Sequence, residues 1–130
     1  MRGGRGRDLI QGSKGPDHLI GHQQHDLLRG GAGNDILRGK SGHDTLHGGK
    51  GNDSMRGDSG SDRFRLSTGN DTIEDFSITQ GDVIEAPNNL NLRLIQQGDH
   101  LLLKDFDNNI KTKLLNINSD DLLAHQPDLI

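Results

Sequence analysis

The sequence predicts an all-β solenoid in which short strands stack on short strands, and three observations indicate this fold class. An aspartate recurs at every ninth residue from Asp8 to Asp71 without a miss. An apolar residue stands two positions after each of these aspartates, and a glycine stands two positions before all but one. Hydrophobic residues make up only 28% of the chain, so one inward apolar side chain per repeat suits a thin stack of strands better than a conventional core.

The repeated unit reads Gly-x-x-Gly-x-Asp-x-apolar-x, and each of its positions has a physical interpretation. The two glycines permit backbone angles that other residues avoid, so the first six residues form a tight turn. The last three residues form a short strand whose central, apolar side chain points inward. These central residues are Ile10, Leu19, Leu28, Leu37, Leu46, Met55, Phe64 and Ile73.

The composition alone would be typical of a disordered chain, because so few apolar residues cannot offset the entropy lost on folding. A flexible linker rich in Gly and Asp needs no fixed register, however, so the strict period argues against disorder. The chain has no Cys, which excludes disulfides and thiolate metal sites, and it has no apolar run long enough to span a membrane. Residues 1–7 contain no apolar segment that would make them a cleavable secretion signal.

The net charge of −4 conceals an excess of basic residues in the first half of the chain. Residues 1–65 contain eleven Lys and Arg against eight Asp, whereas residues 66–130 contain four against eleven Asp and Glu. A basic patch can bind nucleic acid, but here the basic residues alternate with Asp, and the chain has no Trp or Tyr for base stacking. We therefore interpret them as a solvated face and expect no nucleic-acid partner.

The repeated aspartates have the spacing that calcium coordination requires. Stacked strands lie about 4.7–4.9 Å apart, and two oxygens on opposite sides of a calcium ion lie roughly 4.6–5.2 Å apart. Carboxylates from two stacked coils can therefore bind one ion, and oxygen-only ligands favour calcium over zinc or copper. The predicted carboxylate ligands are Asp8, Asp17, Asp26, Asp35, Asp44, Asp53, Asp62 and Asp71. Turn carbonyls are expected to complete the coordination at Gly30, Gly33, Gly39, Gly42, Gly48, Gly51, Gly57 and Gly60.

Two spans of the repeat, Gly30–Arg38 and Gly48–Arg56, read Gly-Gly-x-Gly-x-Asp-x-apolar-x without a departure. They resemble the RTX, or haemolysin-type, calcium-binding nonapeptide. The resemblance covers about residues 3–73. Residues 69–76 and 81–84 are also similar to the segment that closes such rolls in serralysin-like proteins.

The resemblance implies a right-handed parallel β-roll in which each nonapeptide forms half a coil. It also implies that calcium lies between turns that are two repeats apart in the sequence. The implied pairs of aspartates are Asp8/Asp26, Asp17/Asp35, Asp26/Asp44, Asp35/Asp53, Asp44/Asp62 and Asp53/Asp71.

Several turns depart from the family pattern. Gln24 replaces the glycine before Asp26, and Leu66 and Ser67 begin the turn before Asp71. The second glycine is replaced at Ser13, His22, Lys40 and Asp58. A non-Gly residue where the backbone needs a positive φ costs on the order of 1 kcal/mol. We therefore expect the early coils around Gln24 to be the least stable part of the roll.

The nonapeptide period stops after Asp82, and residues 77–130 are predicted to form a β cap on a roll of residues 1–76. The expected strands of the cap are Leu90–Leu94, His100–Lys104 and Ile110–Ile117. Ser119-Asp120-Asp121 is expected to cap one short helical turn that carries Leu122 and Leu123. The Asp and Asn spacing in residues 105–109 resembles a calcium loop, but the glycine and the closing Glu of such a loop are missing, so a hairpin turn is the better interpretation.

No residues suggest catalysis. His22-Gln-Gln-His25 is not the His-Glu-x-x-His motif of zinc proteases, and the chain has no nucleophile–base pair or phosphate-binding loop. We therefore predict a non-enzymatic protein that binds calcium and folds when it does so. Two alternatives stay open: a non-catalytic tail of a secreted protease, lipase or alginate epimerase, and a metal-buffering or surface-adhesion protein.

The family resemblance also implies export. Members of this family travel through a one-step bacterial secretion machinery with an uncleaved C-terminal signal. We therefore expect a secreted, extracellular protein that meets this machinery as a partner. The candidate signal is Asp120–Ile130.

Overall fold

The computed structural model describes residues 1–87 and 90–130 as two facing stacks of strands, a C-terminal hairpin and a short helical segment. The strands are β1 (Arg2–Gly4), β2 (Leu9–Gln11), β3 (His18–Gln23), β4 (Leu27–Ala32), β5 (Ile36–Ser41), β6 (Thr45–Lys50), β7 (Ser54–Ser59), β8 (Arg63–Arg65), β9 (Gly69–Ile73), β10 (Val83–Glu85), β11 (Arg93–Gln97), β12 (His100–Asp105) and β13 (Ile110–Leu114). The helices are α1 (Ser119–His125) and the 3-10 turn η1 (Pro127–Leu129).

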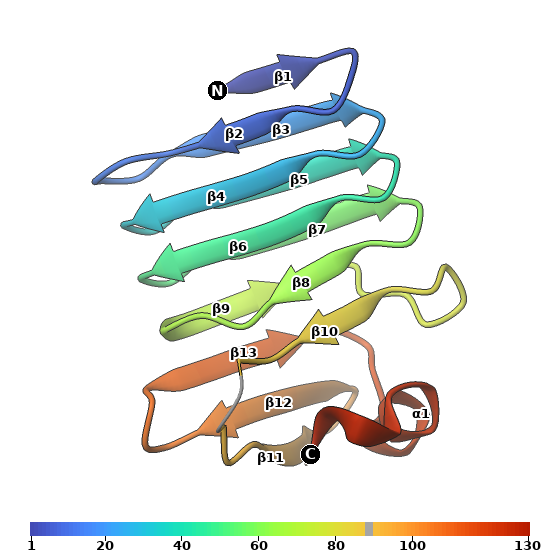
Figure 1. Ribbon diagram of the computed structural model, residues 1–130. Coiled ribbons are helices and arrows are strands. Elements are labelled where there is room, and N and C mark those ends of the chain that lie inside the picture. The colour runs from blue at the N-terminus through green and yellow to red at the C-terminus, as the bar shows by residue number, and fades with distance from the viewer. Residues whose placement is uncertain (88–89) are drawn as a thin grey trace.

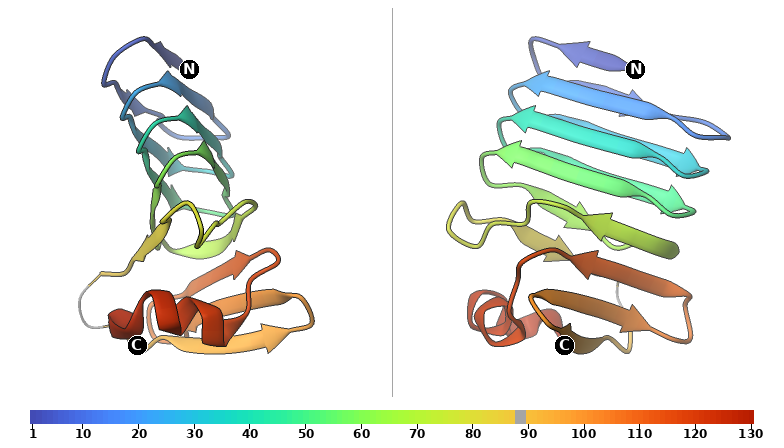
Figure 2. Two further views of the ribbon diagram at one scale, coloured as in Figure 1. Left: turned by 90° about the vertical axis from the view of Figure 1, so that its right-hand side faces the viewer. Right: turned by 180° about the vertical axis from the view of Figure 1, so that it is seen from behind.

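The chain winds between the two stacks so that each strand of the roll pairs in parallel with the strand two places further on. One sheet has eight strands in the order β1-β3-β5-β7-β9-β13-β12-β11, and the other has five in the order β10-β8-β6-β4-β2. Figure 1 shows the coils descending from the N-terminus, and Figure 2 shows the two layers edge-on. This arrangement confirms the predicted right-handed parallel β-roll.

The core of the roll is a double column of single side chains, one from each nonapeptide. Leu19, Leu37, Met55 and Ile73 line up from one sheet, and Ile10, Leu28, Leu46 and Phe64 line up from the other. All eight are 5% exposed or less, as the repeat pattern predicted. The space between the sheets is thin because each coil contributes only these two side chains and the glycines beside them.

The strands of the middle coils are longer than the three residues that the repeat predicted. β5 has six residues, and its buried positions are Leu37 and Gly39. The first glycine of the next repeat therefore continues the strand and faces inward, because side chains alternate between the faces of a strand. The prediction that all six residues from this glycine onward form the turn is wrong for these coils.

The C-terminal elements cover the last coil. β13 pairs in parallel with β9, and β12 and β11 follow it as an antiparallel meander. Strands were expected close to these positions, although β11 begins only at Arg93. The helix is longer than the single turn predicted, and Asn118 rather than Ser119 caps it by accepting a hydrogen bond from the Asp120 N–H.

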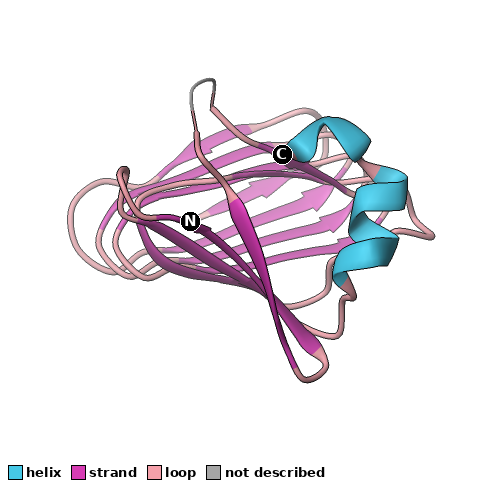
Figure 3. Cartoon of the chain, turned by 90° about the horizontal axis from the view of Figure 1, so that it is seen from below, coloured by secondary structure: helices cyan, strands magenta, loops and turns pink. Residues whose placement is uncertain are grey.

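The helical segment lies beside the last strand of the five-stranded sheet (Figure 3). The Gln126 side chain accepts a hydrogen bond from the Ile84 N–H at 2.6 Å and donates one to the Ile84 carbonyl at 2.8 Å. It thereby pairs with the backbone of β10 as another strand would, and it blocks this edge of the sheet. Because β10 pairs with β8, the roll itself reaches Glu85.

Candidate metal centre

The turns of the roll form two rows, one along each side of the stack. The first row holds the turns that end at Asp8, Asp26, Asp44, Asp62 and Asp82. The second row holds the turns that end at Asp17, Asp35, Asp53 and Asp71. Stacked neighbours within a row therefore come from repeats that are two apart in the sequence, as the family resemblance implied.

From Asp26 onward, each turn aspartate is tied to the coil before it through one carboxylate oxygen. The Asp35 Oδ1 accepts a hydrogen bond from the Asp17 N–H at 2.8 Å, and the same bond recurs in all six predicted pairs at 2.8–3.0 Å. The structure thus brings together every pair of aspartates that the resemblance implied. It does so through a ladder of carboxylate-to-backbone bonds that the sequence did not predict.

The second carboxylate oxygen has a different environment. In six turns the Oδ2 atom is buried and has no hydrogen-bond partner among the described residues. These atoms belong to Asp8, Asp26, Asp35, Asp44, Asp53 and Asp62. A buried carboxylate oxygen without a donor is unfavourable, so a row of them indicates sites for a cation.

The remaining turn aspartates have protein donors at Oδ2. The Ser13 N–H donates to Asp17 at 2.8 Å, and the Ser67 hydroxyl donates to Asp71 at 2.8 Å. Both serines stand where the family pattern has the second glycine. Of the replacements of the second glycine, only these two serines stand in turns whose Oδ2 atom has a protein donor, and at Ser13 this donor is the backbone N–H and not the side chain.

The first glycine of each turn makes room for the carboxylate. A Cβ added to Gly30 would overlap both the Oδ2 of Asp35 and the carbonyl oxygen of Gly48, which belongs to the next turn of the row. The same two kinds of oxygen meet beside Gly3, Gly12, Gly21 and Gly39. The φ of Gly30 lies outside the left-handed region, so this glycine is required for space and not, as predicted, for its backbone angles.

The glycine two positions before the aspartate does have the predicted positive φ. Gly51 has φ of 127°, and a Cβ there would overlap the carbonyl oxygen of Gly33, one coil earlier. Gln24, the one replacement at this position, keeps a positive φ of 76°, as expected. Three of the replacements of the second glycine also have positive φ: His22, Lys40 and Asp58.

Oxygen atoms of two kinds thus converge between stacked turns. Within residues 1–87 and 90–130, no three His, Asp or Glu side chains come together as a metal site by themselves. Each turn instead offers one carboxylate, and backbone carbonyls lie beside it. This donor set suits a hard cation such as calcium, which takes six to eight oxygen ligands in flexible geometry.

Burial makes the ionised form of these carboxylates costly. It is the largest cause that raises the pKa of Asp26, Asp44 and Asp53, with a smaller rise from the neighbouring carboxylate of the row. Burial raises the pKa of Asp62 to about 6 and that of Asp71 to about 7. A cation held beside these carboxylates would favour their ionised form and lower their pKa values again.

Asp82 belongs to the first row, although it was not among the predicted ligands. Its Oδ1 accepts the Asp62 N–H at 2.8 Å, which continues the ladder after 20 residues instead of 18. The turn before it is two residues longer than the others, so the strict period missed it. The Asp82-x-Ile84 spacing, which repeats the Asp-x-apolar end of the unit, was the signal that could have found it, although Gly81 stands one position before the aspartate instead of two.

Two other sequence features have structural explanations. Asp105 accepts hydrogen bonds from the Asp107 N–H and the Asn108 N–H, so its loop is the predicted hairpin turn. His25 and His43 stack with ring centroids 4.8 Å apart, and the Nδ1 of His25 accepts the His43 N–H. No helix in the described part of the chain is long and apolar enough to cross a membrane.

Comparisons with known proteins agree with this geometry. The model of the RTX calcium-binding nonapeptide repeat, which holds four copies, matches residues 2–37 and again residues 38–73. The chain is 28% identical to the AlgE6R3 subunit of the Azotobacter vinelandii mannuronan C5-epimerase, whose solution structure it matches with a TM-score of 0.59 over 80% of this chain and 72% of that one. A search of curated proteins found no significant match. Because the family model covers more than half of the chain, the chain belongs to the family of RTX calcium-binding nonapeptide repeats.

Proposed function

We propose that the two rows of turns bind calcium ions and that this binding drives the roll to fold. The observation that carries the proposal is the row of buried Oδ2 atoms without a donor, each beside the first glycine of its own turn. Calcium supplies the positive charge that these oxygens lack. The family membership supports calcium over other hard cations.

The proposed ligands follow from this geometry. The carboxylates of Asp8, Asp26, Asp35, Asp44, Asp53 and Asp62 would hold ions through Oδ2, and turn carbonyls such as that of Gly48 would complete each site. Asp17 and Asp71 would take part only if they exchange the serine donors at Oδ2 for an ion. The remaining predicted carbonyl ligands, from Gly30 to Gly60, lie in the same turns.

Calcium would promote folding because only the stacked turns bring these oxygens together. In an unfolded chain, aspartates that are 18 residues apart share no site, so binding free energy is available only to the folded roll. The thin double column of apolar side chains stabilises the roll only a little, so the free energy of calcium binding is needed for folding.

The proposal is tested by counting the bound ions. Equilibrium dialysis with radioactive calcium should give a stoichiometry that falls when Asp35→Asn and Asp53→Asn are introduced together. Asp107→Asn, at an exposed hairpin position, is the control and should leave the count unchanged. An unchanged count in the double variant would show that these turns hold no ion.

We also propose that the chain acts as a secreted, non-catalytic module, either by itself or as the tail of an exported enzyme. The similarity to a subunit of an epimerase supports the second form. Within residues 77–130, the elements that follow β10 would then serve as the cap of the roll. Asp120–Ile130 would be read by the secretion machinery before folding. Because Gln126 also pairs with β10, deletion of this segment would disturb the roll as well.

Export is therefore better tested with a point variant than with a deletion. Asp120→Asn and Asp121→Asn change exposed charges at the start of α1 and spare the contacts of Gln126. If these acidic residues are part of the signal, the double variant should accumulate in the cell with a normal fold. Export equal to that of the original chain would show that these two acidic residues are not part of the signal.

A further inference from the structure

The last turn of the first row, residues 75–82, is held by protein groups where the other turns offer open carboxylate oxygens. Asp75 stands 18 residues after Gly57, where a regular repeat would have its first glycine. Its Oδ1 accepts the Gly57 N–H at 3.0 Å, and its Oδ2 accepts the Asp58 N–H at 2.8 Å. Both oxygens of this carboxylate are therefore occupied by the backbone of the preceding turn.

The rest of the longer turn is satisfied in the same way. The Gln80 Oε1 accepts the Gly60 N–H at 2.9 Å, and the Ser61 hydroxyl donates to the Gly81 carbonyl at 2.7 Å. The Asp82 Oδ2 accepts the Ser77 N–H at 2.8 Å. Side chains of the two stacked turns thus bond to each other's backbone, and Asp82 closes its own turn through Ser77.

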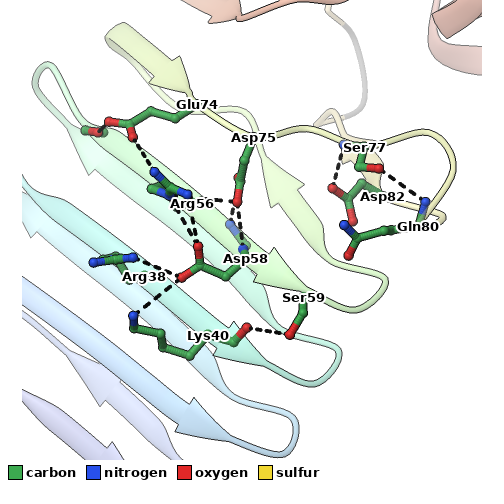
Figure 4. A network of polar contacts seen from close by, with 12 residues as sticks. Arg38, Lys40, Arg56, Asp58, Ser59, Glu74, Asp75, Ser77, Gln80 and Asp82 are labelled. Carbon is green, nitrogen blue, oxygen red and sulfur yellow. Dashed lines mark hydrogen bonds and ion pairs between the residues drawn. The ribbon is translucent and has the colours of Figure 1, made fainter.

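The contacts of Asp75 continue across three coils on the outer face of the eight-stranded sheet (Figure 4). Arg56 lies 3.9 Å from the Asp75 carboxylate and 3.2 Å from that of Asp58. The other oxygen of Asp58 is 3.3 Å from Arg38 and 3.9 Å from Lys40, one coil earlier. The chain of charges therefore joins β5, β7 and the segment after β9.

Asp58 holds this position at an unfavourable backbone angle. It replaces the second glycine of its repeat and has φ of 66°, a region that side-chain-bearing residues seldom adopt. A glycine would relieve the backbone but would remove the carboxylate that three basic side chains surround.

We propose that Arg56, Asp58 and Asp75 form a calcium-independent latch that keeps the last coils stacked when the ion sites are empty. The inference rests on the proposed function, because it assigns the order in which the coils lose structure when calcium is removed. Among the described residues, the coils before β5 form no ion pairs of this kind with one another, so they rely more on bound ions. The latched coils then offer a template on which the earlier coils stack as calcium binds.

Hydrogen exchange of the full chain, measured by mass spectrometry with and without chelator, tests the latch. In chelator, amides of residues 54–76 should exchange at least about tenfold more slowly than those of residues 9–32. Asp75→Ala removes two charge-assisted hydrogen bonds and should abolish most of this difference in chelator. In saturating calcium the same variant should change protection by less than about threefold, because the ions hold the coil.

Two further variants exclude a general loss of stability. Asp58→Gly should also lower protection in chelator, although it restores the family glycine and relieves the backbone. Glu74→Gln, which removes a neighbouring exposed charge that contacts Arg56 at 3.6 Å, should leave the difference in place.

Uniform exchange along the original chain in chelator would overturn the latch and leave calcium-driven folding intact. A loss of protection with Glu74→Gln as large as that with Asp75→Ala would also overturn it. Identical protection everywhere with and without calcium would instead refute the proposed function.

Discussion

Replacement of Asp62 by Asn should change the stability of the roll in opposite directions with and without calcium. The Asp62 side chain is 1% exposed, and its Oδ1 accepts the Asp44 N–H at 2.9 Å. Asparagine keeps an acceptor for this bond, and it removes the charge at Oδ2. The substitution therefore separates the hydrogen-bonding role of the carboxylate from its role as an ion ligand.

Without calcium, the substitution should be stabilising. Burial raises the pKa of Asp62 from 3.8 to about 6, so the ionised group opposes folding above that pH by on the order of 3 kcal/mol. Asparagine carries no such penalty. With calcium at about 1,000 times the dissociation constant, loss of one ion should cost about 4 kcal/mol. This loss exceeds the gain from removing the charge, so the net effect becomes destabilising by about 1 kcal/mol and its sign reverses.

Urea denaturation at pH 7.5 measures both effects, with calcium and with chelator plus an osmolyte that populates the folded chain. Asp107→Asn serves as the control and should shift neither midpoint, because Asp107 is exposed in the hairpin. Destabilisation of similar size under both conditions would refute the reasoning, because Asp62 would then be a structural hydrogen-bond acceptor only.

Further expectations concern pH and the turn residues. In chelator, urea midpoints should rise as the pH falls from 8 to 5, because Asp62 and Asp71, with folded pKa values of about 6 and about 7, lose a charge that opposes folding; calcium affinity, measured by isothermal titration, should fall over the same range as protons compete. In thermal unfolding, Gly6→Ala should lower the free energy of unfolding by roughly 1 kcal/mol, because Gly6 has a positive φ. Gly51→Ala should lower it by well over this amount, because Gly51 also has a positive φ and its added Cβ would overlap a carbonyl oxygen. Gln24→Gly should slow hydrogen exchange in the early coils at limiting calcium, because it removes a positive φ from a side-chain-bearing residue; faster exchange there would contradict our account of that turn.

The sequence predicted the roll because its period is strict. A fixed register of Asp, Gly and an apolar residue leaves one way to place the inward side chains, and Leu19, Leu37 and Leu46 are 0% exposed as expected. The pairing of aspartates two repeats apart came from the family resemblance. The ladder of Oδ1 bonds fixes the same pairs, and it follows from the stacking distance of strands.

The sequence was less informative where the period changes. The first glycine was predicted to be needed for its backbone angles, but Gly30 is needed because the carboxylate of Asp35, five residues further along the chain, lies against its Cα. Asp82 was not predicted as a turn aspartate because two extra residues in its turn shift it out of the nine-residue register. The role of Asp75 depends on contacts with Gly57 and Asp58 that no local pattern encodes.

Far-ultraviolet circular dichroism of the chain during a calcium titration tests the central claim most directly. The account predicts that the β signal rises steeply with calcium at neutral pH, that magnesium at the same concentration does not reproduce the rise, and that chelator reverses it. Magnesium is expected to fail because it demands a smaller, near-octahedral site. A full β signal in chelator, unchanged by added calcium, would contradict the claim that ions in the turns drive the roll to fold.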